Sequence, residues 1–454
     1  MNITSRVKNC YPLLLLLVLA LATRFLFLWY PAQVVFDEVH FGKFVSAYFS
    51  QQYYFDIHPP LGKLMIAGLA HLTGVRPDAA FVKIGEAVSS RELFILRFLP
   101  GLFGCLLPLV FYGIVLALGG SGKTAFLAGL LAVFENAFLV ESKFLLVDSF
   151  LFFFGFLSIL VFLLSRKQED RLKKYLLYFA SMVFASLAFS IKWTGLSFLG
   201  IILFFSFISS LKNFSLKRFL KFLAEVFISL LLFVFVYSLP FVVHFKLLNL
   251  SGPGDPYMSQ EFQQTLIGNM VSKEVKPMPF WQKLIELNQK MFFYNSTLKI
   301  GHQDASRFYE WPLDRKPVWY WNGHEDVLFG DIYLFGNPLV FWPAALAVCW
   351  GIISFARKRN WTIAFLLFGY FINLLPFIFI GRAAFLYHYL PSLGFAILLL
   401  ALFLDRFWAT KQLFPYGYLL LVYIGFLLLF PITYGYLLPV NIAAAYRFLV
   451  NLFH

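Results

Sequence analysis

The stretch YPLLLLLVLALATRFLFLWYPAQVVFDEVHFGK, residues 11–43, holds a long apolar run, 11–30, and soon after it two adjacent acidic residues. About 20 mostly apolar residues are enough to cross a bilayer as a helix. Asp37 and Glu38 are therefore predicted to lie at a membrane–water boundary. Acidic side chains are costly there and often mark a working site, but such a pair can also simply end a helix in water. The stretch alone leaves both interpretations open.

The composition extends the same pattern to the whole chain. Of its 454 residues, 60% are apolar, 20% are aromatic and only 13% are charged, whereas ordinary soluble domains carry roughly 25% charged residues. Sixty phenylalanines, in runs such as 150–164, are too many for a soluble core of this size. We therefore predict an all-α polytopic membrane protein that forms a single transmembrane domain over residues 1–454.

Eleven segments are long and apolar enough to be predicted as membrane spans. They cover residues 12–30, 94–118, 124–140, 145–164, 175–190, 193–211, 219–243, 339–356, 361–380, 384–404 and 415–438.

The basic residues predict the orientation of these spans. The net charge of +14 does not indicate nucleic-acid binding, because the basic residues sit in short loops between apolar runs instead of forming a stripe on a soluble fold. If the N-terminus is inside, the basic loops around Lys123, 166–174, 212–221, 357–359 and 406–411 all fall inside as well. This is the asymmetry of the positive-inside rule and of contact with anionic lipid headgroups.

Two long segments then fall on the outer side, residues 31–93 and 244–338. The first holds the Asp-Glu pair and His58-Pro59-Pro60. Apolar residues recur among polar ones at helical spacing over 41–49 and 61–72. This pattern predicts two short amphipathic helices at the membrane surface.

Several charged residues outside the Asp-Glu pair are predicted to share its membrane depth. A carboxylate beside embedded cations suits transfer from a lipid-phosphate donor, since the cations hold the phosphate and the carboxylate accepts a proton from an attacking hydroxyl. No cysteine spacing indicates a metal site, and no cofactor is expected. Singly, each of these residues is equally explained by snorkelling or by ending a helix. They are Arg97, Asp148, Lys192, Arg382 and His388.

Three ordered motifs resemble the protein O-mannosyltransferase family. The first is FDEVHFGK with YFDIHPPLGK, at 36–43 and 54–63; the second runs from Gly301-His302 through Trp311-Pro312-Leu313 to Trp319-Tyr320; the third is LYHYLP, at 386–391. The resemblance implies a GT-C type fold that moves mannose from a polyprenyl monophosphate to Ser or Thr hydroxyls of proteins, with inversion and without a metal.

The resemblance also implies roles for individual residues. Asp37 matches the catalytic base, Glu38 its neighbour, and Arg97 a donor-phosphate ligand, which we expect Lys192 or Arg382 to assist. Further residues fall in the motifs or near them as supporting or substrate-contacting candidates: His58, Lys63, Asp148, His302, Trp311, Arg315, Tyr387, His388 and Tyr389.

One departure from the eukaryotic members concerns the second outer segment. Those members carry a β-trefoil MIR domain there, whereas here about 95 residues without strand-rich repeats fill 244–338. We therefore expect a bacterial type of the family, in the inner membrane, with its site facing the periplasm. Two alternatives remain at this point: a transferase of the same fold that moves aminoarabinose onto lipid A, and a polytopic transporter, which would place its polar residues at the bilayer midplane.

Overall fold

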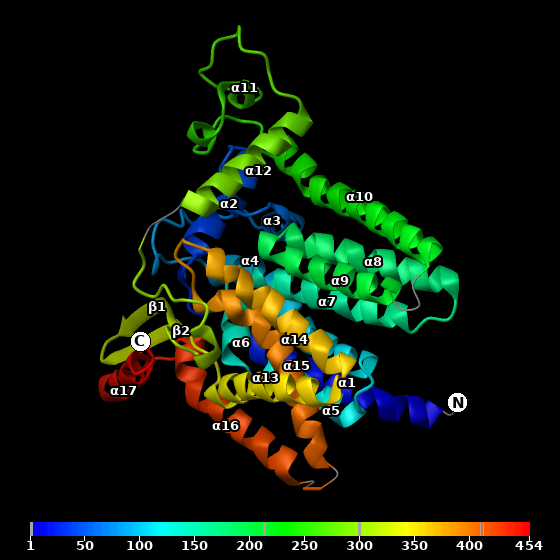
Figure 1. The fold of residues 1–454 in the computed structure, drawn as a ribbon. Coiled ribbons are helices and arrows are strands. Elements are labelled where there is room, and N and C mark those ends of the chain that lie inside the picture. The colour runs from blue at the N-terminus through cyan, green and yellow to red at the C-terminus, as the bar shows by residue number, and fades with distance from the viewer. Residues whose placement is uncertain (1–2, 212–214, 298–300, 409, 412) are drawn as a thin grey trace.

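The computed structural model describes residues 3–211, 215–297, 301–408, 410–411 and 413–454. Helices dominate, as predicted (Figure 1). The helices of the first half are α1 Ile3–Phe25, α2 Glu38–Ser50, α3 Leu61–Leu72, α4 Ser90–Ala117, α5 Gly122–Val133, α6 Asn136–Lys143, α7 Asp148–Arg166, α8 Arg171–Phe189, η1 Trp193–Gly195, α9 Leu196–Leu211 and α10 Leu216–Leu247. The second half holds η2 Asp255–Tyr257, α11 Gln260–Gln263, α12 Phe280–Thr297, η3 Trp311–Leu313, α13 Pro338–Lys358, α14 Trp361–Leu374, η4 Leu375–Phe379, η5 Leu386–Tyr389, α15 Leu390–Trp408, α16 Leu413–Tyr434 and α17 Val440–Asn451.

The predicted spans match these helices closely. Within the described residues, nine helices, some continued by a short 3-10 turn, are long and apolar enough to cross a membrane. The segment predicted over 124–140 is divided into α5 and α6, which meet at an angle of 58°, as in a broken span or a re-entrant loop. The first predicted span, 12–30, overlaps α1, which runs over Ile3–Phe25 and so ends before the predicted boundary at residue 30.

Polar side chains fix where several of these helices begin. The hydroxyl of Ser89 accepts a hydrogen bond from the backbone N–H of Glu92 at the start of α4, and Asp170 accepts one from Lys173 at the start of α8. Asn360 does the same for α14. Such caps satisfy N–H groups that the first helical turn leaves without a partner.

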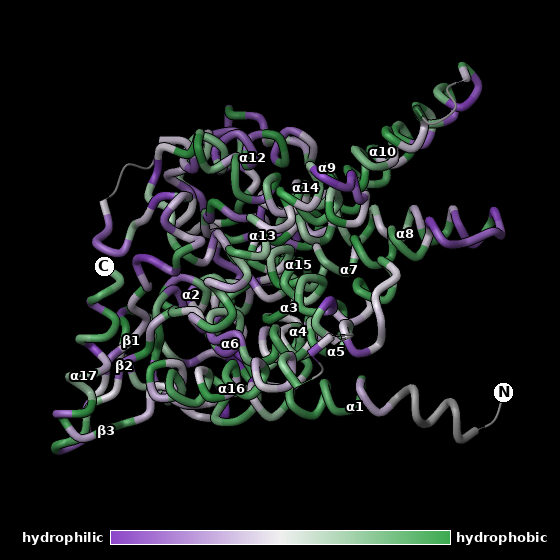
Figure 2. Tube along the Cα trace, turned by 60° about the horizontal axis from the view of Figure 1, so that its bottom comes forward, coloured by the Kyte–Doolittle hydropathy of each residue, from purple (hydrophilic) through white to green (hydrophobic). Residues whose placement is uncertain are grey.

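Burial separates an inner from an outer set of helices. Most of the apolar length of α4, α7 and α15 is buried, whereas α8, α9, α10, α13 and α16 expose most of theirs. Exposed apolar side chains on long helices are what lipid contact requires. Figure 2 shows this pattern as apolar colour along the helices, with hydrophilic colour where α8 and α10 begin.

The two long segments, 31–93 and 244–338, meet at one end of the bundle, which we call the loop face. The two amphipathic helices predicted in 31–93 are confirmed as α2 and α3. The second segment adds α12 and a small sheet, β1 Val318–Glu325 and β2 Leu328–Leu334, with β3 Leu438–Pro439. This sheet was not predicted. Its strands are antiparallel in the order β1-β2-β3, and α17 packs beside β2 (Figure 1).

Backbone contacts join the two segments. The N–H of Phe36 donates to the carbonyl of Tyr320 at 3.0 Å, and the two rings stack with centroids 4.0 Å apart. Gln52 and Leu250 form an isolated bridge. The position of residues 36–38 therefore depends on the hairpin nearly 300 residues later.

Candidate active site

The two adjacent acidic residues point in different directions. Glu38 is the first residue of α2 and is fully buried. Its carboxylate accepts two hydrogen bonds from Arg97, at 2.7 and 2.8 Å, and one each from the N–H groups of Val35 and Leu145, both at 2.8 Å. Four donors saturate this carboxylate, so Glu38 holds α2 against α4 and against the chain just after α6.

Arg97 lies early in α4, as the sequence suggested, but its side chain is directed to Glu38. It is fully buried in α4, and the donors that Glu38 leaves free bind the backbone carbonyls of Leu28, Pro31 and Gln33 at 3.0–3.3 Å. A guanidinium has five N–H donors in a fixed fork, and these partners occupy it. Its partner in the structure is Glu38, and it does not line the cavity described next, so this geometry does not support the expected role of Arg97 as a phosphate ligand.

Asp37 faces a cavity of about 360 Å³ at the loop face. It precedes α2 as its N-cap, but its carboxylate caps no N–H group there, and no described residue donates a hydrogen bond to it. Burial raises the pKa of Asp37 above its ordinary value of 3.8, while His40 and Lys192 oppose that shift. Asp37 is therefore an uncommitted carboxylate with increased proton affinity, which is what a general base requires.

Two cations line the same cavity. Lys192, between α8 and η1, donates to the carboxylate of Asp148 at 2.6 Å, and its ammonium lies 5.3 Å from the ring centre of Tyr387. Arg382, between η4 and η5, is half-buried, and its guanidinium makes no hydrogen bond or ion pair with any described residue. Its donors are available to an anion.

Asp56 is a cavity carboxylate that we did not single out from the sequence. Lys63, buried in α3, donates to its carboxylate and to the carbonyl of His58, the latter at 2.9 Å. Burial lowers the pKa of His58 well below 6.5, and the positive charges of Lys192 and Lys63 add to this effect. His58 is therefore a neutral imidazole at the cavity wall. The signal for Asp56 was its place within the motif YFDIHPPLGK.

Glu141 and Tyr320 form a second pair that the sequence analysis missed. The phenol of Tyr320 donates to the Glu141 carboxylate at 2.5 Å, and both side chains are buried. Burial, followed by the charge of Glu141, raises the pKa of Tyr320 well above 10. Since Tyr320 also contacts Phe36, this pair ties residues 36–38 to α6. Tyr320 lay in a quoted motif, whereas Glu141 directly follows the span predicted over 124–140 and was not singled out.

The remaining candidates divide into two groups. His302, Tyr387 and His388 line the cavity. Trp311 is buried behind His388, stacked with its centroid 6.1 Å away, so it supports the wall without facing the cavity. The structure does not bring Tyr389 and Arg315 to the site. The hydroxyl of Tyr389 lies 3.3 Å from that of Tyr370, and Arg315 is exposed outside the cavity.

Two apolar grooves continue from this cavity. The nearer, about 250 Å³, shares His58, Lys192 and Arg382 with it, and the farther, about 410 Å³, runs between α9 and the α14–η4 segment. The cations therefore stand where a polar cavity meets an apolar groove. Among the described residues, no group of three or more His, Cys, Asp or Glu side chains could hold a metal ion.

Comparison with solved structures defines the class of protein. The Saccharomyces cerevisiae protein O-mannosyltransferase Pmt1-Pmt2 complex bound to the sugar donor superposes with a TM-score of 0.86 at 20% identity, over 94% of this chain and 90% of that chain. ArnT from Cupriavidus metallidurans, in the apo state, gives 0.53 at 12% identity, over 90% of this chain and 62% of that one. The fold is that of GT-C type membrane glycosyltransferases.

Family models then identify the chain more closely. One described as dolichyl-phosphate-mannose-protein mannosyltransferase matches residues 14–249, and one described as the C-terminal four TMM region of protein-O-mannosyltransferase matches residues 280–450. The chain belongs to the protein O-mannosyltransferase family, which confirms the resemblance of its motifs.

Curated relatives agree with this assignment. Dolichyl-phosphate-mannose–protein mannosyltransferase 4 of Saccharomyces cerevisiae is 30% identical over 321 residues, which are 67% of this chain and 40% of that protein. Protein O-mannosyltransferase 1 of Drosophila melanogaster is 34% identical over 57% of this chain and 30% of its own length. The chain thus spans about 40% or less of the length of these relatives.

Proposed function

We propose that this chain transfers mannose from a polyprenyl-phosphate-mannose donor to Ser or Thr hydroxyls of proteins, with inversion at the anomeric carbon. One observation carries the proposal: Asp37 is an uncommitted carboxylate in a cavity where Lys192 and Arg382 stand at the mouth of an apolar groove. The groove suits a polyprenyl chain and the cations suit its phosphate. Family membership favours this activity over the aminoarabinose transferase and the transporter.

The chemistry follows from these positions. The acceptor oxygen attacks the anomeric carbon while its proton passes to the Asp37 carboxylate, and the bond from that carbon to the phosphate oxygen breaks with its electron pair. Lys192 and Arg382 stabilise the negative charge that grows on the departing polyprenyl phosphate. Because phosphate is a good leaving group, the step needs no general acid, in contrast to glycoside hydrolysis.

The same proposal includes an orientation. The basic loops gather at the end of the bundle opposite the loop face. Two of them lie where α8 and α10 begin (Figure 2). The positive-inside rule then puts the cavity on the non-cytoplasmic side. For a bacterial member this is the periplasmic side of the inner membrane.

A direct assay tests the function. Purified chain incubated with polyprenyl-phosphate-mannose and a Ser/Thr-rich peptide should add one hexose to the peptide, as seen by mass spectrometry. The same peptide with every Ser and Thr replaced by alanine is the matched control. Folded protein that modifies neither peptide, or both equally, would contradict the proposal.

The cation at the groove mouth gives a separate prediction. Arg382→Gln should weaken binding of polyprenyl phosphate about 10- to 100-fold, because a hydrogen bond to a charged group contributes about 1.5–3 kcal/mol. Isothermal titration with polyprenyl phosphate measures this. Arg91→Gln, at an exposed arginine in the first turn of α4, is the control and should bind normally. Equal affinities in the two variants would remove Arg382 from the phosphate site.

A further inference from the structure

A second groove lies at the opposite end of the bundle from the catalytic cavity. Helix α7 begins at Asp148, beside the cavity, and ends at Arg166, which lines this second groove. Eighteen residues of helix rise about 27 Å, close to the roughly 30 Å of a hydrocarbon core. The groove therefore lies at the other membrane boundary, well away from the proposed donor site.

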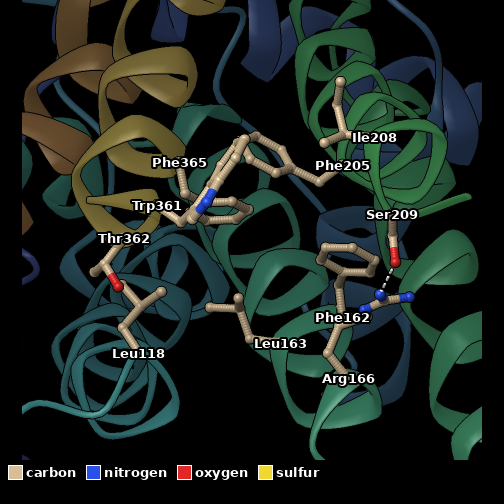
Figure 3. Close-up of a pocket in the computed structure, with 10 residues that line it drawn as sticks. All are labelled: Leu118, Phe162, Leu163, Arg166, Phe205, Ile208, Ser209, Trp361, Thr362 and Phe365. Carbon is tan, nitrogen blue, oxygen red and sulfur yellow. Dashed lines mark hydrogen bonds between the residues drawn. The ribbon is translucent and has the colours of Figure 1, made fainter. Parts of the chain in front are cut away.

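The walls of this groove are apolar. It encloses about 260 Å³ between α7, α9 and the first turn of α14, and its sides include Phe162, Leu163, Phe205 and Phe365 (Figure 3). An apolar cavity of about 150 Å³ in a protein stays dry and takes up benzene. The larger volume here accommodates a segment of hydrocarbon chain.

The rim of the groove is polar and positively charged. Arg166 donates a hydrogen bond to the hydroxyl of Ser209, and Thr362 lies on the opposite side of the opening (Figure 3). The start of α14 is already capped, since Asn360 accepts from the N–H groups of Thr362 and Ile363, so it offers little to an anion. Arg166 is exposed, and the N–H groups that Ser209 does not engage are accessible to an anion.

The charge of the surrounding loops matches an acidic ligand. Residues 166–174 contain five basic and two acidic side chains, and residues 357–359, just before α14, are Arg-Lys-Arg. The indole of Trp361 lies on the groove wall and is 57% exposed, in keeping with the preference of Trp for membrane interfaces. Basic pockets between membrane helices are suited to anionic lipid headgroups.

We propose that this groove binds one anionic phospholipid, with its phosphate on Arg166 and part of an acyl chain between α7, α9 and α14. The ligand belongs to the leaflet opposite the catalytic cavity and takes no part in mannosyl transfer. It fills a gap between helices that would otherwise be packed only by mobile bulk lipid.

Native mass spectrometry of the delipidated full chain tests the proposal. With an equal mixture of dioleoyl-phosphatidylglycerol and dioleoyl-phosphatidylcholine, one phosphatidylglycerol should be retained preferentially. Arg166→Gln should lower that preference about tenfold or more, the effect of losing a hydrogen bond to a charged group. Arg171→Gln changes the first residue of α8, across the short α7–α8 connection, which does not line the groove, and should leave the preference intact.

Two further variants locate the lipid. Ser209→Phe puts a ring into the groove and should reduce retention of both lipids, while Arg382→Gln, at the other membrane boundary, should change neither. Equal retention of the two lipids by the unaltered chain overturns the proposal, because it shows that the charge of the headgroup does not select the lipid. An equal loss in Arg166→Gln and Arg171→Gln overturns it in favour of diffuse charge attraction. Loss in Arg382→Gln overturns it in favour of the donor groove.

Discussion

Replacing Asp37 with asparagine should lower the turnover number for mannosyl transfer by about 10²–10⁴-fold or more, because a positioned base typically contributes that factor. Asparagine keeps the shape of the side chain and removes its basicity. The Asp37 carboxylate makes no hydrogen bond with a described residue, so the substitution leaves no buried donor unsatisfied and the protein should fold normally. Polyprenyl-phosphate affinity should be largely retained, so that the loss appears in kcat.

A control variant and a pH profile make the Asp37→Asn result specific. Asp326→Asn, at an exposed carboxylate in the β1–β2 turn, makes the same chemical change away from the cavity and should be silent. The base works only when deprotonated, so kcat/KM should fall as the pH drops through the pKa of Asp37. Because burial raises that pKa, the fall should lie above pH 3.8. Near-normal transfer by a folded Asp37→Asn variant would show that another group is the base.

Replacing Arg97 with methionine should destabilise the protein by about 3–5 kcal/mol, the usual cost of removing one partner from a buried ion pair. The substitution leaves the Glu38 carboxylate buried with only two N–H donors, and it also frees three backbone carbonyls that Arg97 now binds. Thermal unfolding in detergent measures the loss. Arg91→Met, on the exposed side of the same helix, is the control.

A double-mutant cycle separates pairing from packing. Combining Arg97→Met with Glu38→Leu removes both charges, so the double variant should lose less stability than the two single losses added together. If Arg97→Met instead unfolds like the unaltered protein and shows only weaker polyprenyl-phosphate binding, Arg97 is a phosphate ligand after all and the ion pair has little structural role.

The spans were predictable because lipid imposes a simple rule. A membrane helix must be long and apolar whatever it packs against, so each predicted segment corresponds to a helix or to a bent pair of helices. The small sheet was not predictable in the same way. Its β1 strand holds polar as well as aromatic residues, and it is set by pairing with β2, a contact that apolar run lengths do not report.

The site was predictable only as far as membrane depth decides it. The predicted membrane depth put Asp37, Lys192, Arg382 and His388 in one region. The structure places all four on one cavity. Depth could not say which way Arg97 points, because an arginine just inside a helix serves a ligand or a carboxylate equally well. Asp56 was overlooked although Lys63, seven residues on, was among the candidates, because the sequence alone does not show that the two side chains pair.

The saturated carboxylate of Glu38 makes the order of the two acids matter. Exchanging the two residues, so that glutamate stood at position 37 and aspartate at position 38, would preserve the charge, hydropathy and composition of the chain. An aspartate at position 38 would be shorter by one carbon–carbon bond, about 1.5 Å, and would pull away from Arg97, Val35 and Leu145 together. A sequence comparison that treats Asp and Glu as equivalent would therefore accept chains in which α2 has lost this anchor.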